Sequence, residues 1–312
     1  MKIYNTLALC AADREIPKQI AVGVFQGLHI GHQKVIQAAV MAKQAGQAAC
    51  VLTFDFSNNC PPGKTNARAL MTDTQFAQML QQLGVDIIFR IPFEELRDQT
   101  PHEFVAVLGK IGAKGVFCGA NFHFGKGAAG TPDMLAELGA AAGFTVGVQA
   151  LCCVDGETVS STRIRRILQA GEMPKAAALL GRSFSIDFAV EHGRALGRSM
   201  GIPTINQPFP PGFSIPRYGV YASLVHLPSG LHSAVTNIGV KPTVGSDNVL
   251  AETFIHAFSG DLYGQRVRVD ILEFVRPEQK FGSMAELQAQ ILRDSACAEE
   301  ISRKYRKNGE IR

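Results

Sequence analysis

The sequence lacks the features that mark membrane, disulfide-stabilised and repeat proteins. No apolar run in its 312 residues reaches the roughly 18 residues of a membrane span. The seven cysteines form no C-x-x-C pair, so we expect reduced thiols in a cytoplasmic protein. Polar residues follow the short apolar patch within Met1–Ala12, so we do not expect a signal peptide there. Neither a repeat of solenoid period nor a low-complexity tract is present.

The charge balance is close to neutral. Lys and Arg total 31 against 27 Asp and Glu, which gives a net charge of +4. No long polybasic surface is implied, so neither nucleic acid nor a membrane is an expected partner. Hydrophobic residues make up 46% and charged residues 19%, as in folded proteins, and the length allows one large or two ordinary domains.

Strand-like and helix-like patterns alternate through the first part of the chain. Amphipathic segments separate apolar runs that have the length of strands, at 20–25, 48–54, 86–91, 116–118 and 144–149. Thr100, Pro101 and Glu103 form the start signal of one of the helices. This alternation predicts an α/β domain with a doubly wound, Rossmann-like parallel sheet. Ligands of such sheets bind beyond the carboxyl ends of the strands.

A glycine-rich turn follows the first of these strands. Residues 23–32 read Gly-Val-Phe-Gln-Gly-Leu-His-Ile-Gly-His, and an amphipathic helix is expected over 34–46. Gly27 lets the backbone approach a ligand, and a helix N-terminus attracts anions. His29 and His32 could donate hydrogen bonds to phosphate oxygens during phosphoryl or nucleotidyl transfer. The alternatives are a tight turn with capping histidines or a metal site, for which two ligands are too few.

Two further segments of the first half suit anions. Residues 119–127 form a glycine-rich loop that follows the strand at 116–118 and contains Asn121. Residues 159–166 read Val-Ser-Ser-Thr-Arg-Ile-Arg-Arg, in which Ser160 or Ser161 can cap a helix. Hydroxyl groups and arginines at a helix N-terminus would make a second anion site. The alternative is an ordinary capped helix with basic surface residues.

The pattern changes after Gly181-Arg182. Short strand-like runs are then separated by Gly/Pro turns, as at Pro228-Ser229-Gly230, and Ser283 can cap a C-terminal helix. This spacing predicts a small antiparallel β-barrel with a C-terminal helix. We therefore predict two domains, at 1–182 and 183–312.

The second half carries its own candidate site. A basic, glycine-rich loop over 193–201 could wrap phosphates with its backbone N–H groups. Thr204 and Asn206, two residues apart on an extended segment, offer oxygen donors that suit Mg²⁺. Glu252 lies in an apolar strand and could act as a general base for a substrate hydroxyl. The alternative is an outward-facing glutamate on a half-exposed strand.

Several of these segments resemble known signatures. Residues 23–32 resemble the G-x-F-D-G-x-H-x-G-H signature of HxGH nucleotidylyltransferases, and residues 159–166 resemble the S-S-T-x-I-R segment of bacterial FMN adenylyltransferases. The second half resembles riboflavin kinase through five segments, at 201–206, 218–221, 237–243, 258–264 and 276–281. Nearly the whole chain is thus similar to the bacterial bifunctional riboflavin kinase/FMN adenylyltransferase (FAD synthetase) family.

The resemblance implies an enzyme that makes FMN from riboflavin and FAD from FMN, using ATP and Mg²⁺. In the first domain it implies catalytic roles for His29 and His32. The residues it implies for ATP binding there are Gly23, Phe25, Gly27, Asn121, Ser161, Thr162 and Arg165. In the second domain it implies Glu252 as the proton acceptor. The ligand-binding residues implied there are Gly197, Gly201, Thr204 and Asn206 for ATP, Thr204 and Asn206 for Mg²⁺, and Arg276 for flavin.

Two departures from the family pattern leave alternatives open. Gln26 stands where the flavin branch usually has Asp, and Asp55-Phe56-Ser57 stands where it usually has Pro-His-Pro. One alternative is a riboflavin kinase whose first domain is a non-catalytic flavin-binding or regulatory module. Another is a non-flavin nucleotidylyltransferase fused to a binding barrel. Self-association and channelling of FMN between the domains are left open.

Overall fold

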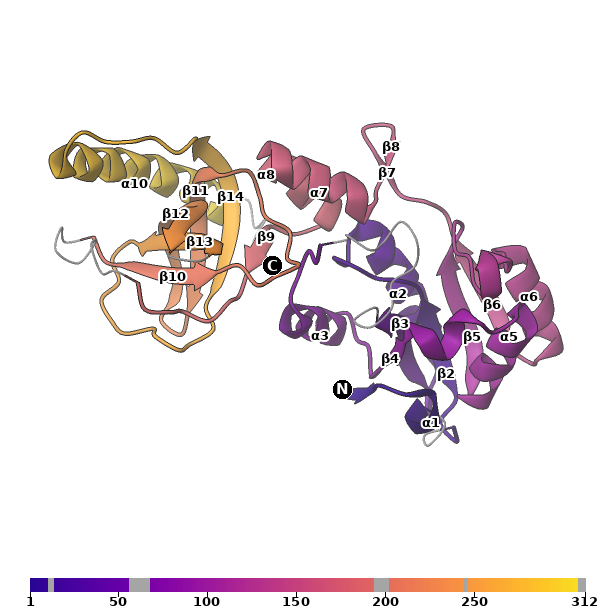
Figure 1. Cartoon of the computed structure of the whole chain (residues 1–312). Coiled ribbons are helices and arrows are strands. Elements are labelled where there is room, and N and C mark those ends of the chain that lie inside the picture. The colour runs from indigo at the N-terminus through magenta and orange to yellow at the C-terminus, as the bar shows by residue number, and fades with distance from the viewer. Residues whose placement is uncertain (11–13, 56–67, 194–201, 244–245, 308–312) are drawn as a thin grey trace. The chain divides into compact units, whose positions relative to one another are not determined.

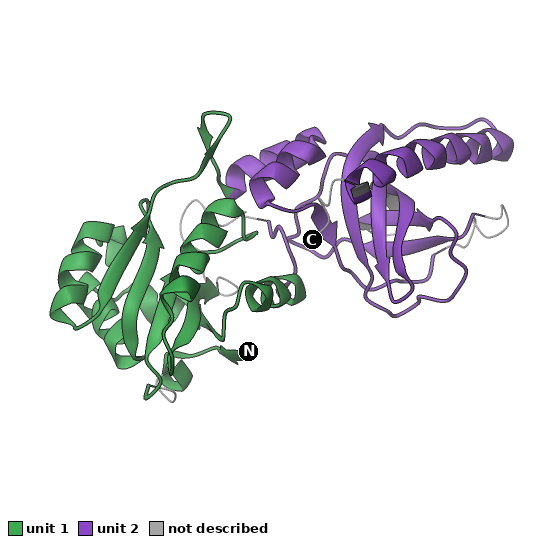
Figure 2. Cartoon of the chain, turned by 180° about the vertical axis from the view of Figure 1, so that it is seen from behind, with its two compact units in different colours: residues 1–67, 73–160 green, residues 68–72, 161–312 purple. Residues whose placement is uncertain are grey.

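The computed structural model describes residues 1–10, 14–55, 68–193, 202–243 and 246–307 (Figure 1). The chain divides into two compact units (Figure 2), of which unit 1 comprises Met1–Ala67 and Asp73–Ser160, and unit 2 comprises Arg68–Thr72 and Ser161–Arg312. Residues 161–182 are thus grouped with unit 2. The domain boundary predicted at residue 182 stays a prediction.

Unit 1 is built on a six-stranded sheet with the order β1-β4-β3-β2-β5-β6, and every neighbouring pair is parallel. Its strands are β1 (Lys2–Tyr4), β2 (Lys18–Val22), β3 (Ala48–Asp55), β4 (Ile87–Pro92), β5 (Ala113–Gly119) and β6 (Thr145–Gln149). Its helices are α1 (Leu7–Cys10), α2 (Ile30–Ala42), α3 (Asp73–Gln82), α4 (Phe93–Arg97), α5 (Pro101–Lys110) and α6 (Pro132–Ala141), and a small hairpin follows, β7 (Cys153–Val154) with β8 (Glu157–Thr158). This arrangement confirms the predicted doubly wound α/β fold.

The burial of unit 1 explains why its strands are almost wholly apolar. Ile20 and Val22 of β2 pack in one core cluster with Phe104 and Leu108 of α5, while α2 packs on β2, β3 and β5. Parallel strands that are covered on both faces read as continuous apolar runs. Thr100 and Glu103 form the predicted capping box at the start of α5.

Unit 2 contains a six-stranded antiparallel sheet with the order β10-β13-β12-β11-β14-β9. Its strands are β9 (Phe184–Ile186), β10 (Thr204–Pro208), β11 (Gly219–Leu227), β12 (Gly230–Thr243), β13 (Ser246–Ile255) and β14 (Arg268–Arg276). Its helices are α7 (Ser161–Ala170), α8 (Met173–Leu180) and the C-terminal α10 (Met284–Lys307). Pro228 and Ser229 form the predicted turn between β11 and β12. The antiparallel sheet and C-terminal helix confirm the predicted architecture.

The sheet of unit 2 closes on itself through the segment that follows β9. Glu191 bridges to Asn206 of β10, its N–H donating to the Asn206 carbonyl at 2.8 Å, and Ala189 bridges to Arg266 just before β14. The buried side chain of Gln207 donates to the carbonyls of Phe188 and Val267 at 2.7 and 2.8 Å. The two ends of the sheet are thereby joined as in a small barrel.

Helix α10 covers part of the outer face of this barrel. It packs on β11, β12 and β14 through the cluster of Val220, Ala222, Val235 and Ala298. Ser283 caps it, its hydroxyl accepting from the N–H of Glu286 at 3.2 Å. In the part of the chain that the structure describes, α10 and the other helices are all too short or too polar to cross a membrane.

Candidate active sites

The first candidate site is the turn between β2 and α2. His29 is the N-cap of α2, and its Nδ1 accepts from the N–H of His32 at 3.3 Å. The two imidazole rings stack with their centroids 3.6 Å apart, and Phe25 meets the His32 ring edge-on at 5.4 Å. Because His29 is only 6% exposed, its orientation is set by the cap, the stack and the surrounding core.

The glycines of this turn are required by space and by backbone conformation. Gly27 has φ of +76°, a region in which a side chain is strained. A Cβ at Gly31 would lie 3.3 Å from the ring of His29, and one at Gly23 would lie 3.1 Å from the ring of Phe25. The small residues therefore allow the aromatic rings to lie close to the start of α2, where the backbone N–H groups and the helix dipole favour an anion.

This turn lies at the point where the strand order of unit 1 reverses. The chain runs from β2 through β3 to β4, and then returns to the other side of β2 to form β5. The turn with His29 and the loop with Asn121 therefore follow neighbouring strands, β2 and β5, at their carboxyl ends. Ligands of open parallel sheets bind at such a point. Asn121 is exposed there.

The departures from the family pattern also lie near this edge. Gln26 is half-buried in the turn itself, and Asp55 is the last residue of β3, which neighbours β2. Phe56 and Ser57 lie outside the described residues.

The other predicted residues for adenylyl transfer belong to unit 2. Helix α7 begins at Ser161, so Ser161 and Thr162 occupy its first turn. The Nε of Arg165 donates to the carbonyl of Arg68 at 2.7 Å, and burial lowers the pKa of its guanidinium.

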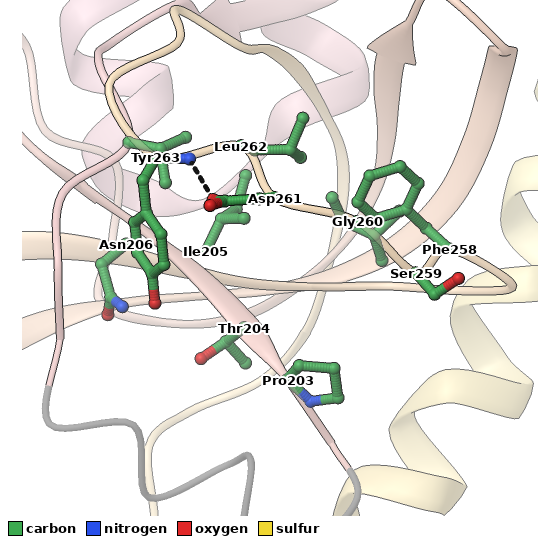
Figure 3. A pocket seen from close by; sticks show the side chains of 12 residues that line it. Pro203, Thr204, Ile205, Asn206, Phe258, Ser259, Gly260, Asp261, Leu262 and Tyr263 are labelled. Atoms are coloured by element: carbon green, nitrogen blue, oxygen red, sulfur yellow. Dashed lines mark hydrogen bonds between the residues drawn. The ribbon is translucent and has the colours of Figure 1, made fainter.

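The second candidate site lies beside β10 in unit 2. A pocket is lined by Thr204 and Asn206 together with the loop over 258–263 (Figure 3). Asn206 is 6% exposed, and its Oδ1 has no hydrogen-bond partner in the described part of the chain. A buried amide oxygen of this kind calls for a ligand, because leaving it unbonded is costly. The predicted common orientation of Thr204 and Asn206 toward one site agrees with this pocket.

Asn206 belongs to a row of polar side chains that crosses three strands. It pairs in register with Glu252 of β13, which in turn pairs with Asn237 of β12. Residues directly opposite on antiparallel strands point to the same face. Asn237 pairs in register with Val220 of β11, so Val220 lies on the same face as this row. Val220 packs in one cluster with Ala298 of α10, so α10 covers a neighbouring part of that face. Glu252 is half-buried and does not line the pocket beside Thr204.

Arg276, predicted to bind flavin, is held by a carboxylate of α10. Its guanidinium donates to both oxygens of Asp294, at 3.1 and 2.8 Å, and its Nη1 donates to the carbonyl of Pro277 at 3.0 Å. The two side chains are 17% and 4% exposed. This geometry ties the end of β14 to the middle of α10, and a flavin-binding role of Arg276 stays a prediction. The predicted Gly197 and Gly201 lie outside the described residues.

The comparisons with known proteins cover both halves of the chain. A family model described as FAD synthetase matches residues 12–163, and one described as riboflavin kinase matches residues 180–302. The bifunctional riboflavin kinase/FMN adenylyltransferase of Pseudomonas fluorescens is 33% identical over 286 residues, which cover 90% of this chain and 92% of that protein. The Listeria monocytogenes protein of the same description is 32% identical over 290 residues, covering 90% and 91%.

The chain belongs to the bifunctional riboflavin kinase/FMN adenylyltransferase family. This membership confirms the resemblance inferred from the sequence. A crystal structure from Streptococcus pneumoniae, described as a macrolide-efflux protein, shares the fold with a TM-score of 0.83 and 25% identity, covering 95% of this chain and 98% of that chain.

Both domains of the bifunctional family are present, so the alternative of a kinase with a merely regulatory first domain is not favoured. The non-flavin nucleotidylyltransferase is not favoured either, because the barrel half matches riboflavin kinase. The Gln26 departure is thus found in a chain that matches the FAD synthetase model across that segment.

The sequence interpretation gave no individual role to three residues that the structure places beside Asn206, Glu252 and the pocket, although each lies in a segment that it singled out. Asn237 lies within a quoted signature, and counting alternate residues along β12 would have placed it on the face of Glu252. Gly193 lies against the Asn206 amide, where a Cβ would overlap it. Tyr263 lines the pocket and stacks on His192 with centroids 3.8 Å apart. These last two contacts join distant parts of the chain, so no local pattern could reveal them.

Proposed function

We propose that this chain makes FMN in unit 2 and FAD in unit 1. In the first reaction the terminal ribityl hydroxyl of riboflavin attacks the γ-phosphorus of ATP, the bond from that phosphorus to the bridging oxygen breaks, and ADP leaves. In the second, an oxygen of the FMN phosphate attacks the α-phosphorus of ATP, and pyrophosphate leaves. The observation that carries the assignment of FMN formation to unit 2 is the register of Asn206 with Glu252, which places a buried amide oxygen of the pocket lining opposite a half-buried carboxylate on the same face.

Glu252 is assigned the role of general base for the ribityl hydroxyl. Its carboxylate accepts that proton as the new O–P bond forms, or orients the hydroxyl for attack. Phosphoryl transfer depends mostly on positioning the reacting groups and on neutralising charge. Strands β10 and β13 contribute to this positioning because they hold Asn206 and Glu252 in register.

Thr204 and Asn206 fit a magnesium ion. A hydroxyl and an amide oxygen are hard donors, and the Oδ1 of Asn206 is buried without a hydrogen-bond partner among the described residues. These two side chains would hold the ion together with phosphates of ATP. When bound, it would offset the negative charge that develops on the phosphates.

The stacked pair of His29 and His32 is assigned to the second reaction. The cap of α2 keeps His29 at a helix N-terminus, where backbone N–H groups and imidazole N–H groups can bind phosphates of ATP. Charge grows on these phosphates in the transition state, so fixed donors lower the barrier. Asn121 is also assigned to ATP binding in unit 1, and the roles of Ser161, Thr162 and Arg165 of α7 in ATP binding stay predictions. A cytoplasmic location and self-association stay predictions.

A product assay tests both assignments at once. Purified protein is incubated with ATP, Mg²⁺ and either riboflavin or FMN, and flavins are separated by chromatography over time. We expect the wild type to form FMN and then FAD. Glu252→Gln should lose at least about 100-fold in FMN formation but still convert FMN to FAD. A variant with His29→Ala and His32→Ala should convert riboflavin to FMN and stop there.

If the histidine double variant makes FAD from FMN at the wild-type rate, the assignment of His29 and His32 is wrong. If Glu252→Gln phosphorylates riboflavin at the wild-type rate, the assignment of Glu252 is wrong.

A further inference from the structure

Glu278 lies in the segment that follows β14 and reaches back to the polar row on the barrel. Its Oε1 accepts from the Nδ2 of Asn237 at 3.2 Å. Asn237 is the register neighbour of Glu252, so the Glu278 carboxylate extends the row of Asn206, Glu252 and Asn237 by one more group.

The space that this carboxylate occupies is left by a glycine, Gly239, which lies two residues after Asn237 on β12. Gly239 of β12 is buried, and a Cβ built there would overlap the Glu278 carboxyl group. Gly239 does not have the positive φ that would otherwise explain a glycine. A glycine at position 239 therefore leaves the space that the Glu278 carboxyl group occupies.

The hydrogen bond fixes which way the Asn237 amide faces. An ionised carboxylate can only accept hydrogen bonds, so the amide atom that faces Glu278 is the nitrogen. With one N–H committed to Glu278, the amide cannot turn over without losing a charge-assisted bond. The near end of the same segment is also held, because Arg276 is clamped to Asp294 of α10.

We propose that Glu278 is a positioning residue of the kinase step. It holds the Asn237 amide in one orientation beside Glu252, and this amide in turn keeps the Glu252 carboxylate and the attacking hydroxyl aligned with the phosphorus. Gly239 is small so that Glu278 can reach this place. The inference rests on the proposed role of Glu252.

Two independent substitutions remove the Glu278 contact. Glu278→Ala deletes the carboxylate. Gly239→Ala displaces it, and since the overlapping atoms are the end of a flexible side chain, the strand itself can remain in place. Glu278→Gln is the conservative variant, because its amide oxygen can still accept from Asn237. Urea unfolding followed by circular dichroism is the control for folding of the barrel, and formation of FAD from added FMN is the control for unit 1.

We expect Glu278→Ala and Gly239→Ala each to lower kcat for FMN formation about tenfold, with KM for riboflavin and ATP changed by less than about twofold. Combining the two should give no further loss, since both remove one contact. Glu278→Gln should keep most of the activity. The formation of FAD from FMN should be unchanged in all of them.

The proposal is overturned if Glu278→Ala keeps its kcat, if Glu278→Gln is as impaired as Glu278→Ala, or if both activities of a variant fall together. Glu252→Gln separates this failure from that of the proposed function. If Glu252→Gln loses FMN formation and Glu278→Ala does not, only the positioning role of Glu278 is wrong. If Glu252→Gln is fully active, the assignment of Glu252 is wrong, and the positioning role falls with it.

Discussion

Some residues that are predicted to bind a ligand also hold the fold, and Arg276 is the clearest case. Sequence resemblance assigns it to flavin, while the structure shows its guanidinium bonded to both oxygens of Asp294. Neither side chain is open to water to any large extent, at 17% and 4% exposure. Removing one partner of such a pair leaves a buried charge without compensation. Loss of the Arg276–Asp294 pair therefore lowers the stability of the protein, whether or not Arg276 binds a ligand.

We predict that Asp294→Ala lowers the free energy of unfolding by about 3 kcal/mol, because Arg276 then keeps its charge without a partner. The measurement is urea unfolding followed by circular dichroism. Lys304→Ala is the matched control in the same helix, since its pair with Glu300 is exposed on both sides and contributes less than about 1 kcal/mol. Equal effects of the two substitutions would contradict the prediction.

Among the elements, α10 is fastened to the barrel by a buried histidine as well as by apolar packing. His256, next to the end of β13, is 8% exposed, and its Nδ1 lies 3.0 Å from the hydroxyl of Ser233 and 3.4 Å from Glu299 of α10. Burial lowers the pKa of His256 below its ordinary 6.5, and the nearby Glu299 carboxylate raises it by a smaller amount. His232 also faces this histidine, through the carbonyl of His256.

This lowered pKa predicts a loss of stability in acid. The unfolded chain binds a proton at His256 more readily than the folded chain does, so stability is fully present above pH 6.5 and falls as the pH drops toward the lowered value. We expect the urea midpoint of the wild type to fall more steeply between neutral pH and pH 5.5 than that of His256→Gln. The control is His102→Gln, at an exposed position of α5. Parallel pH profiles of the wild type and His256→Gln would contradict this account.

At the scale of the whole molecule, each unit has its own core and its own candidate catalytic pair. His29 and His32 are held by unit 1, and Glu252 and Asn206 by unit 2. FMN is the product of one reaction and the substrate of the other. A molecule that is defective in one pair should therefore still serve a partner molecule that is defective in the other, provided that FMN is released.

We predict that a mixture of Glu252→Gln protein and the His29→Ala, His32→Ala protein makes FAD from riboflavin, although neither does so alone. The rate should rise with the concentration of the Glu252→Gln protein, because FMN has to diffuse between molecules. Flavin chromatography over time measures it. A mixture that accumulates FMN without FAD, while Glu252→Gln protein converts added FMN, would show that FMN is not released in usable form.

Much of this architecture could be predicted from the sequence, because its signals are local. The apolar strands, the Thr100 capping box and the turn at Pro228-Ser229 each depend on neighbours in the chain. Some bounds were less accurate. The strand predicted to run on to Phe25 ends at Val22, and the helix expected from residue 34 begins at Ile30, since the His29 cap starts it earlier.

The candidate sites were predictable only in part, for the same reason. His29, His32, Thr204 and Asn206 lie in compact motifs whose residue types reveal their chemistry. The partners that hold the second site come from elsewhere in the chain, as Gly193 does for Asn206 and Asp294 for Arg276. Such pairings depend on strand register and helix packing, which a single sequence does not specify.

The closure of the barrel has a consequence for how the protein behaves in a crowded solution. A strand at the edge of an open sheet presents unpaired N–H and C=O groups on which another polypeptide can add, and this is a common start of aggregation. In unit 2 the segment ending at Glu191 bonds to β10 and occupies part of that edge. The strand that carries Thr204 and Asn206 is therefore shielded along that part from pairing with a foreign strand.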